Sequence, residues 1–272
     1  TNGKSSIADF YYQILNLNNK KVASIGTLGV KSKKLKIDLS NTTIDPIRLS
    51  KILCNLKKQN INNVIMEASS HGLDQNRLDG LFFSTGIFTN LSQDHLDYHK
   101  NIKDYLKAKL YLFNHLIAKN GNVITDEKIP EFKKIKKITI NKNLNLCLLN
   151  DKKNDFKFLS HNFDGEGQLL KIKHNNLIYN VKLNLIGKIQ LKNILMAVIA
   201  AKKSNIEIKK ILEVIPKIKS VEGRFERIGM IKNRSKVILD YAHTPDALKT
   251  CLKNLKEQFP NHKINIVFGC GG

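Results

Sequence analysis

Several features that would define other classes of protein are scarce or missing in this chain of 272 residues. It has no uninterrupted apolar run of the roughly 18 residues that a membrane-spanning helix needs, so we expect no membrane insertion. The opening TNGKSS lacks the apolar segment of a secretory signal peptide. Its four cysteines include no CxxC pair, which disfavours a zinc ribbon or a redox motif and fits the reducing cytoplasm.

Arginine is also scarce, although the formal net charge is +23. Such a charge is compatible with a nucleic-acid partner. The excess is almost entirely lysine, however, scattered among asparagine and isoleucine, and arginine, which reads guanine edges, occurs only five times. We therefore interpret the charge as a solvated basic surface and expect no nucleic-acid site.

Both ends of the sequence have features expected of a truncated chain. There is no initiator methionine, and the final FGCGG follows directly on an apolar run. We expect an internal part of a longer protein. With 42% hydrophobic residues, this part is long enough for one large domain or two smaller ones.

In the first half of the chain, segments of helical apolar spacing alternate with short β-rich runs. Helices are expected directly after TNGKSS, over residues 45–59 with Asp45 as N-cap and Pro46 at the first position, and over residues 101–119. Strands are expected at KVASIGTLGV, NNVIMEASS, STGIFTNLS and NVITD. This alternation predicts an α/β domain with a mainly parallel sheet.

The pattern changes to short strands between about residues 136 and 186. The runs KITI, LCLL, QLLKIKH and LIYNVKL predict a small antiparallel part. Helices are expected again over residues 188–203 and 207–215. A boundary near PKIKSVEGR is followed by the strand–loop–helix pattern of KVILDYAHTPDALKTCLKNLKEQF, and KINIVFGCGG is expected to form a second strand, so a second α/β domain should begin here.

The first residues match the end of a phosphate-binding loop. Gly3, Lys4 and Ser5 form its GK[ST] part, and a helix should follow directly. Glycine lets backbone N–H groups close on phosphate oxygens, lysine reaches the β- and γ-phosphates, and the serine hydroxyl binds Mg²⁺. The upstream glycine of the motif lies outside the sequence, so an ordinary glycine turn before a helix remains the alternative.

Acidic and histidine side chains form a second candidate group. Glu67 ends the run VIME, and the carboxyl end of a parallel strand is where open α/β sheets bind ligands, so it could hold Mg²⁺. A solvent-facing acid is the alternative. His95 and His99 are four apart and would share a helix face suited to zinc, but the glutamate of HExxH is absent. Hydrogen-bonded structural histidines, His71 among them, are the plainer interpretation.

Nine segments together are more specific than any single motif. In order, they are TNGKSS, NTTIDP, MEASSHGLDQNRLDG, FTNLSQDHLDYH, YLKAKLYLF, GKIQLKNILMA, VEGRFE, DYAHTPDAL and VFGCGG. Their order and spacing resemble the Mur ligase family, and within it the type that adds the third amino acid to the UDP-N-acetylmuramoyl dipeptide. The resemblance covers essentially the whole chain.

The resemblance implies a fold and an activity. Residues 1–220 would be a P-loop ATPase-like central domain, and residues 221–272 the start of a Rossmann-like C-terminal domain. The activity would be ATP- and Mg²⁺-dependent amide-bond formation through an acyl phosphate, joining meso-diaminopimelate or L-lysine to the UDP-linked muramyl dipeptide. The family resemblance implies a cytoplasmic monomer. This part of the protein alone is not expected to catalyse the reaction.

The resemblance also assigns roles to single residues. The residues expected to bind ATP are Thr1, Asn2, Gly3, Lys4, Ser5, Ser6, Asn193, Arg224 and Asp240. The residues expected to bind the UDP-linked muramyl dipeptide are Asn41, Thr42, Thr43, Ser69, Gln75 and Arg77. Ser5, Glu67, His95 and Lys109 would bind the metal, with Lys109 in the form of a carbamate. The catalytic residues would be Lys4, Lys109 and His95. Without the resemblance, Lys109 would be interpreted as a solvated helix lysine.

Two positions depart from the family pattern. Ile44 follows Thr43 where a proline is usual, with Pro46 two residues later, and Gln190 replaces an expected asparagine beside the adenine. A folylpolyglutamate synthase-like ligase shares the ATP loop but lacks the SSHGLDQNR and DHLDYH combination. A non-catalytic P-loop or basic nucleic-acid-binding module is the alternative from another class.

Overall fold

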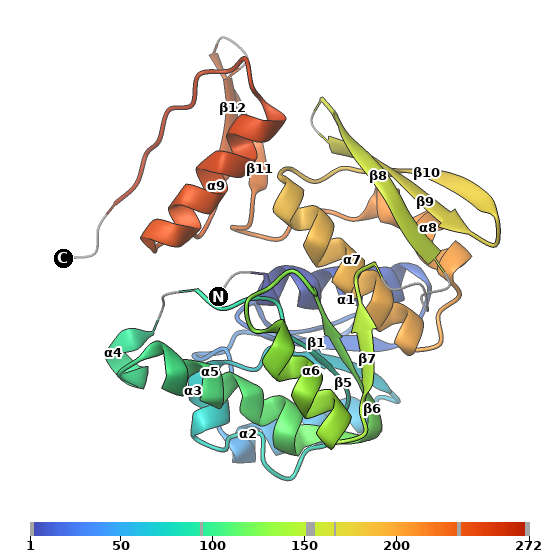
Figure 1. The fold of residues 1–272 in the computed structure, drawn as a ribbon, viewed down its shortest axis with the longest axis vertical. Helices are drawn as coiled ribbons and strands as arrows, with labels where there is room; N and C mark the ends of the chain where they lie inside the picture. Colours follow the sequence, from blue (N-terminus) through green and yellow to red (C-terminus); the bar gives the residue numbers. More distant parts are fainter. Residues whose placement is uncertain (1–2, 93–94, 151–155, 166, 233–234, 270–272) are drawn as a thin grey trace.

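A computed structural model describes residues 3–92, 95–150, 156–165, 167–232 and 235–269 of the chain. Its main body is a layered α/β unit, next to which lie a three-stranded antiparallel sheet and a C-terminal hairpin with one helix (Figure 1). The α/β fold class is confirmed. Among these described residues, no helix is both long and apolar enough to cross a membrane.

One half of the main sheet contains four strands in the order β3-β2-β1-β4. They are β1 (Val22–Gly26), β2 (Gly29–Ser32), β3 (Lys36–Ile37) and β4 (Asn63–Met66). β1 and β4 are parallel, whereas β1 and β2 are antiparallel. KVASIGTLGV is therefore two strands and not the single strand expected, because Gly29, with a φ of 83°, completes a tight reversal after Gly26.

The other half contains β5 (Phe83–Ile87), β6 (Ile117–Thr125) and β7 (Asn145–Leu148), all parallel. The expectation that LCLL belongs to an antiparallel part is wrong. A helix, α6 (Phe132–Asn141), connects β6 to β7, and such a crossover returns the chain in the same direction.

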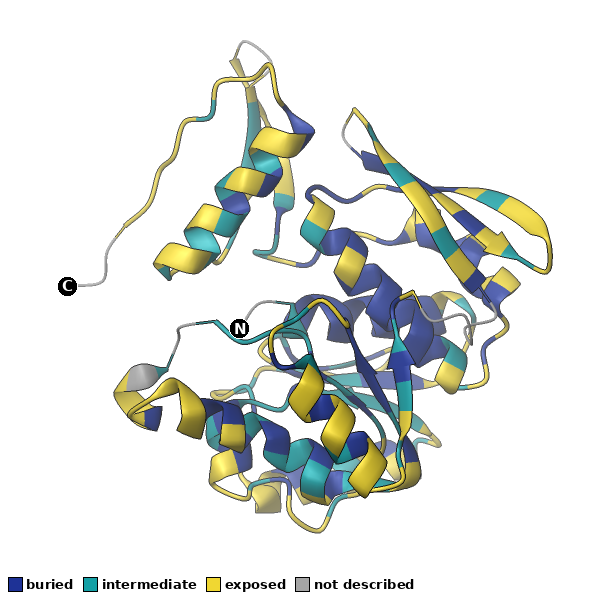
Figure 2. Ribbon diagram, viewed as in Figure 1, coloured by how far each residue is buried: buried dark blue, intermediate teal, exposed yellow. Residues whose placement is uncertain are grey.

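Helices cover both faces of these half-sheets. On one face, α1 (Lys4–Leu17) packs against α7 (Lys188–Lys203), followed by α8 (Ile208–Val214) and a 3₁₀ turn (Ile215–Lys217). Buried residues are concentrated on α1 and α7 (Figure 2). The other face carries α2 (Pro46–Lys58), α3 (Ser70–Asp74), α5 (Ile102–Tyr111) and α6. The expected helices after TNGKSS and at 45–59 are confirmed, and Asp45 caps α2 by accepting the N–H of Arg48 at 2.8 Å.

Two sequence predictions on this second face are wrong. The helix expected over 101–119 ends at Tyr111, continues as a π-helical turn (Leu112–Leu116) and becomes β6 at Ile117. The π turn buries Phe113 and Leu116 and leads directly into β6, so the helical pattern continues in the sequence where the regular helix has already ended. KITI is helical because it lies within α6, where Ile135 and Thr139, four apart, form one buried face.

The antiparallel sheet has the order β10-β9-β8. QLLKIKH and LIYNVKL form β9 (Gly167–His174) and β10 (Leu177–Leu183) as expected, whereas β8 (Phe156–Asp164) was not anticipated. Leu170 and Ile172 alternate with exposed lysines and face the core shared with α1 and α7.

The C-terminal unit consists of β11 (Glu226–Ile231), β12 (Ser235–Leu239) and α9 (Pro245–Gln258). α9 is capped by Thr244, whose hydroxyl accepts the N–H of Ala247 at 3.3 Å. The strand expected from KINIVFGCGG is absent over 263–269, where Val267 is 99% exposed, because no neighbouring strand pairs with this segment. The domain division at residue 220 remains a prediction.

Candidate nucleotide and metal site

A cavity of about 460 Å³ lies where the N-terminus of α1, the ends of β1 and β4 and the C-terminal unit meet. It gathers most of the residues predicted from the sequence. Those that line it are Gly3, Lys4, Ser5, Ser6, Asn41, Thr42, Thr43, Glu67, Ser69, Arg77, His95, Asn193, Arg224 and Asp240. Gln75 and Lys109 do not line it, and Thr1 and Asn2 lie outside the described residues.

The phosphate-loop residues form a tight left-handed turn at the start of α1. Gly3 has a φ of 97°, and its carbonyl accepts the N–H of Ile7 at 2.9 Å. A Cβ on Gly3 would come within 2.6 Å of the Asn193 side-chain oxygen. Glycine is therefore needed for the conformation and for the close approach of α7. Lys4, Ser5 and Ser6 in the first turn of α1 line the cavity, and the N-terminus of a helix favours anions.

Glu67 is held immediately beyond β4 by partners from two other elements. It is 5% exposed, and its carboxylate accepts the Ser5 hydroxyl at 2.9 Å and the Thr27 N–H at 2.8 Å. The Thr27 hydroxyl lies 3.3 Å from the same carboxylate and 3.0 Å from the Thr42 hydroxyl. A serine hydroxyl and a carboxylate oxygen, both hard ligands, therefore meet beside the phosphate turn.

Gly26 leaves the space that Glu67 occupies, because a Cβ there would lie 2.3 Å from the Glu67 Oε1 atom. We expect Gly26→Ala to displace the carboxylate and weaken Mn²⁺ binding, measured by titration, by about tenfold to a hundredfold. Gly229→Ala is the matched control, since that strand glycine has open space where its Cβ would be. Equal metal affinity in the two variants would contradict this role of Gly26.

The predicted substrate residues form a connected group around Thr43. Its hydroxyl donates to the Glu67 carbonyl at 3.0 Å and accepts the N–H of Ser69 at 2.9 Å. Arg77 donates through Nη1 to the Thr43 carbonyl at 2.6 Å and through Nε to the Gln75 side chain at 2.9 Å. Gln75, predicted to contact substrate, thus lies outside the cavity and fixes the Arg77 guanidinium.

The histidines cluster beside the same cavity. His95 has a left-handed backbone (φ 55°), and its ring centroid lies 4.9 Å from that of His71. It precedes α4 (Leu96–His99), whose last residue, His99, is 4% exposed and stacks on Tyr105 at 5.0 Å. Burial, and then the nearby His71, lower the pKa of His99. In the described ranges, no group of three His, Cys, Asp or Glu side chains is arranged to hold a metal ion.

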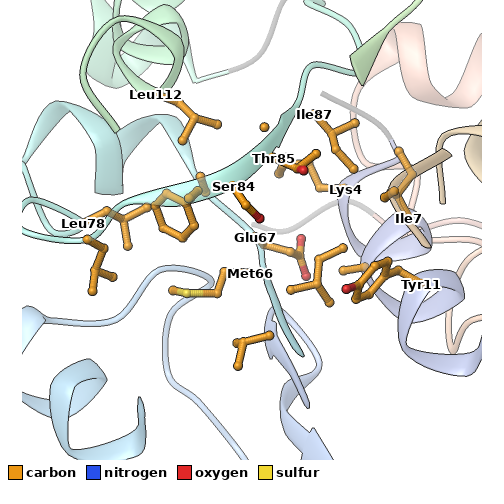
Figure 3. A pocket seen from close by; sticks show the side chains of 18 of the residues that line it. Lys4, Ile7, Tyr11, Met66, Glu67, Leu78, Ser84, Thr85, Ile87 and Leu112 are labelled. Carbon is orange, nitrogen blue, oxygen red and sulfur yellow. The ribbon is translucent and has the colours of Figure 1, made fainter. Parts of the chain in front are cut away.

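Lys109 lines a second cavity of about 370 Å³, which shares Lys4 and Glu67 with the first. Figure 3 shows Lys4 and Glu67 at this second cavity. The Lys109 Nζ lies 5.0 Å from the Tyr105 ring centroid and 5.8 Å from that of Phe88. Lys109 of α5 thus lines the second cavity together with Lys4 and Glu67, and its ammonium group lies near two aromatic rings.

The C-terminal unit supplies the opposite wall of the main cavity. Asp240 accepts the Phe225 N–H at 2.9 Å, and the Arg224 guanidinium lies 4.6 Å from the Tyr241 ring centroid. Burial raises the pKa of Asp240, although the Phe225 N–H and Arg224 oppose the shift. Gln190, the departure from the family pattern, accepts the Asn193 amide at 2.9 Å and so fixes that side chain.

Cys251 lines the main cavity but should be unreactive there. Burial, and then the nearby Asp240 carboxylate, raise the pKa of its thiol to about 12 from the ordinary 9.0. The thiolate fraction at pH 8 is then about 10³-fold below that of an unperturbed thiol. We expect iodoacetamide to label exposed Cys54 well before Cys251, as read by peptide mass spectrometry. Labelling of both at similar rates would contradict this environment.

Thr27 is one of the cavity residues that sequence reasoning missed, and it contacts the Glu67 carboxylate. It follows β1 directly, as Glu67 follows β4, and both strands point their carboxyl ends at the cavity. That shared position at the carboxyl edge of a parallel pair is the signal that could have found it.

Comparison with known families decides the classification. The Mur ligase middle domain matches residues 1–201, and the glutamate ligase domain of Mur ligases matches residues 223–272. The chain belongs to the Mur ligase family. This confirms the resemblance stated from the motifs.

Among its relatives are enzymes named UDP-N-acetylmuramoyl-L-alanyl-D-glutamate–2,6-diaminopimelate ligase. The one from Rickettsia montanensis is 39% identical over 278 residues, covering 100% of this chain and 57% of the relative. The one from Zymomonas mobilis is 36% identical over 272 residues, covering 100% and 56%. This Mur ligase chain thus spans little more than half the length of these relatives.

Solved structures agree with the fold. A structure of a ligase with the same name has a TM-score of 0.79 at 28% identity, covering 100% of this chain and 55% of that one. A folylpolyglutamate synthase of Mycobacterium tuberculosis, complexed with ADP and AMPPCP, has a TM-score of 0.71 at 15% identity, covering 95% and 65%. At that identity the second likeness shows the fold alone.

Proposed function

We propose that the protein containing this Mur ligase chain joins meso-diaminopimelate to UDP-N-acetylmuramoyl-L-alanyl-D-glutamate at the expense of ATP. The observation that carries the proposal is the contact between Ser5 and Glu67 beside a left-handed Gly3 turn, in a cavity also lined by Asn193 and Asp240. The names of relatives at 36–39% identity favour diaminopimelate over L-lysine as the added amino acid.

The residues fit a magnesium nucleotide. A hydroxyl and a carboxylate oxygen 2.9 Å apart match the preference of Mg²⁺ for a few oxygen ligands, the rest being water and phosphate. Ser5 and Glu67 would hold the ion, and His95 lines the same cavity. When bound, Mg²⁺ neutralises the charge that develops on the transferred phosphoryl group.

The proposed reaction has two steps. A carboxylate oxygen of the D-glutamate attacks the γ-phosphorus of ATP, the bond to ADP breaks, and an acyl phosphate forms. The amine of the incoming amino acid then attacks the acyl carbon, the C–O bond to phosphate breaks, and the amine loses a proton. Lys4 would hold the phosphoryl oxygens in the first step, and the α1 N–H groups would bind the phosphates.

The cavity wall formed by residues 41–43, Ser69 and Arg77 supports binding of the anionic substrate. The Arg77 guanidinium is fixed by Thr43 and Gln75 and so needs little reorganisation before meeting a carboxylate. Arg224 and Asp240 would contact the phosphates and the ribose from the C-terminal unit. A cytoplasmic monomer without a nucleic-acid partner is part of the same proposal.

The test uses the full-length protein and measures phosphate release from ATP. We expect release only when UDP-N-acetylmuramoyl-L-alanyl-D-glutamate, diaminopimelate and Mg²⁺ are all present. Release driven by a folate substrate would favour the folylpolyglutamate synthase-like alternative. Steeply salt-dependent DNA or RNA binding without any release would favour the nucleic-acid-binding alternative.

A further inference from the structure

The helix α7 begins at a residue that cannot cap it. Its N-cap is Gly187, which has no side chain. The first N–H groups of a helix find no partner within the helix, and a serine, threonine, aspartate or asparagine at the N-cap usually accepts one of them. Gly187 is buried, so water is not at hand to take this place. The first turn of α7 therefore needs acceptors from another part of the chain.

Two amide side chains of α9 supply these acceptors. The Gln258 Oε1 atom accepts the Gly187 N–H at 2.6 Å, and the Asn254 Oδ1 atom accepts the Ile189 N–H at 2.8 Å. Asn254 and Gln258 are four apart on α9 and share its buried face. We call these two bonds the amide clamp. Through it the C-terminal unit caps a helix of the main body (Figure 1).

The antiparallel sheet holds Gly187 from the other side. Gln168 of β9 is fully buried, and its Nε2 atom donates to the Gly187 carbonyl at 3.0 Å and to the Leu185 carbonyl at 3.2 Å. Both the N–H and the C=O of Gly187 are therefore bonded to buried amide side chains. The start of α7 is thus fixed to β9 and to α9 at the same residue.

Apolar side chains surround the amide clamp. Ile186, Phe225, Cys251 and Phe259 form one buried cluster, against which Leu255 of α9 packs. Hydrogen bonds shielded from water in this way are costly to leave unmade, because the separated donors and acceptors stay buried without a partner. The cluster and the clamp together favour one position of α9 on α7.

The clamped turn of α7 also contributes to the main cavity. Gln190 and Asn193 both line that cavity, and the Gln190 Nε2 atom donates to the Arg224 carbonyl at 3.3 Å. Arg224 and Asp240 line the cavity from the C-terminal unit. The clamp therefore joins the two walls between which a nucleotide would bind, within one or two helical turns of Asn193.

We propose that Asn254 and Gln258 are positioning residues, whose side-chain oxygens hold the C-terminal unit on the N-terminus of α7 and so place Arg224 and Asp240 opposite Asn193. This inference rests on the proposed binding of ATP in the main cavity. The residues expected to bind the muramyl dipeptide belong to the main body and have no bond to the clamp among those described. Loss of the clamp should therefore weaken the use of ATP and spare the use of the dipeptide.

Phosphate release by the full-length protein tests this with Asn254→Leu and Gln258→Met combined in one variant. Both substitutions remove the acceptor oxygen and keep a side chain of similar size. We expect the KM for ATP to rise by about tenfold or more, because the two walls of the cavity lose their alignment. The KM for UDP-N-acetylmuramoyl-L-alanyl-D-glutamate should stay within about twofold. General destabilisation would lower the Tm and the fraction of active enzyme without separating the two KM values.

Two further variants isolate the acceptor oxygens. Asn55 and Gln59 are also an amide pair four apart, on α2, and neither lines the main cavity. Asn55→Leu with Gln59→Met therefore repeats the same change elsewhere and should leave both KM values within about twofold. Gln258→Glu keeps an oxygen for the Gly187 N–H and gives up a 3.5 Å contact with the Gly165 carbonyl, so its KM for ATP should stay close to normal.

Hydrogen exchange in the unchanged full-length protein examines the clamp without any substitution. With mass spectrometry and residue-level fragmentation, the Gly187 and Ile189 amides should exchange at least about tenfold more slowly than amides of exposed loops, before nucleotide is added. Fast exchange at both amides, or an equal KM for ATP in the α9 variant and the α2 control, would overturn this inference alone. An unchanged protein that released no phosphate would overturn the proposed function, and this inference with it.

Discussion

Replacing Lys4 with alanine is expected to lower the rate of ATP-dependent ligation by about 10³-fold, with the protein still folded. Lys4 lines both the main cavity and the second cavity, and in the proposed reaction it neutralises the phosphoryl group during its transfer. Its side chain is not part of the buried apolar core, and the loss should therefore appear in kcat and in ATP affinity with little change in Tm.

The matched control for this prediction is Lys20→Ala, which removes an exposed lysine beyond the end of α1. It should leave phosphate release within about twofold of the unchanged protein, as surface substitutions usually do. Lys4→Ala with near-normal turnover would refute the phosphate-loop assignment. If both variants lost activity together with their melting transitions, the effect would be one of folding and the assignment would again lose its support.

The second large effect is expected at Lys109, where alanine should abolish ligation. Lys109 lines the second cavity together with Lys4 and Glu67, and the carbamate that the family resemblance implies would turn a cation into an anion able to support a second Mg²⁺. Formate or acetate should restore part of the activity of Lys109→Ala, because a free carboxylate can take the place of the carbamate oxygens. Phosphate release in the presence and absence of these salts measures the rescue.

A control on the same helix separates this role from general effects on α5. Lys107 is exposed two residues earlier, so Lys107→Ala should keep its activity and show no response to formate. The Lys109 variant should also lose any dependence of activity on bicarbonate, which the unchanged protein should display. Full ligation activity in the Lys109→Ala variant would contradict the role of a carbamylated Lys109.

The local part of the site could be predicted from the sequence because it depends on short-range rules. A glycine–lysine–serine run before a helical pattern predicts a phosphate turn, and the left-handed Gly3 confirms that conformation. Glu67 at the end of a β-rich run was expected beside it, and the 2.9 Å contact with Ser5 brings the two together. Asp45 caps α2 as predicted, whereas the Thr244 cap of α9 was not anticipated.

Other features depend on tertiary partners and were mispredicted or missed. KITI alternates over only four residues, which does not separate a strand from a lysine-rich helix whose inner face is Ile135 and Thr139. The segment 263–269 has strand composition but no neighbour to pair with. Lys109 could be located only through the family resemblance, because its spacing on α5 says nothing about Lys4 or Glu67.

The interrupted sheet shows the same limit at the level of topology. Sequence periodicity indicated a mainly parallel sheet, and every pair among β5, β6 and β7 is parallel. The order of strands, and with it the division of the described strands β1 to β7 into two half-sheets, follows from loop crossings and packing that no local pattern encodes.

The most direct test of the account is a crystal structure of the full-length protein with a non-hydrolysable ATP analogue and Mn²⁺. The account predicts an anomalous manganese peak about 2.0–2.3 Å from the Ser5 Oγ and a Glu67 carboxylate oxygen, with the γ-phosphate beside Lys4. A nucleotide bound elsewhere, or a manganese ion held by other residues with Ser5 and Glu67 still bonded only to each other, would contradict it.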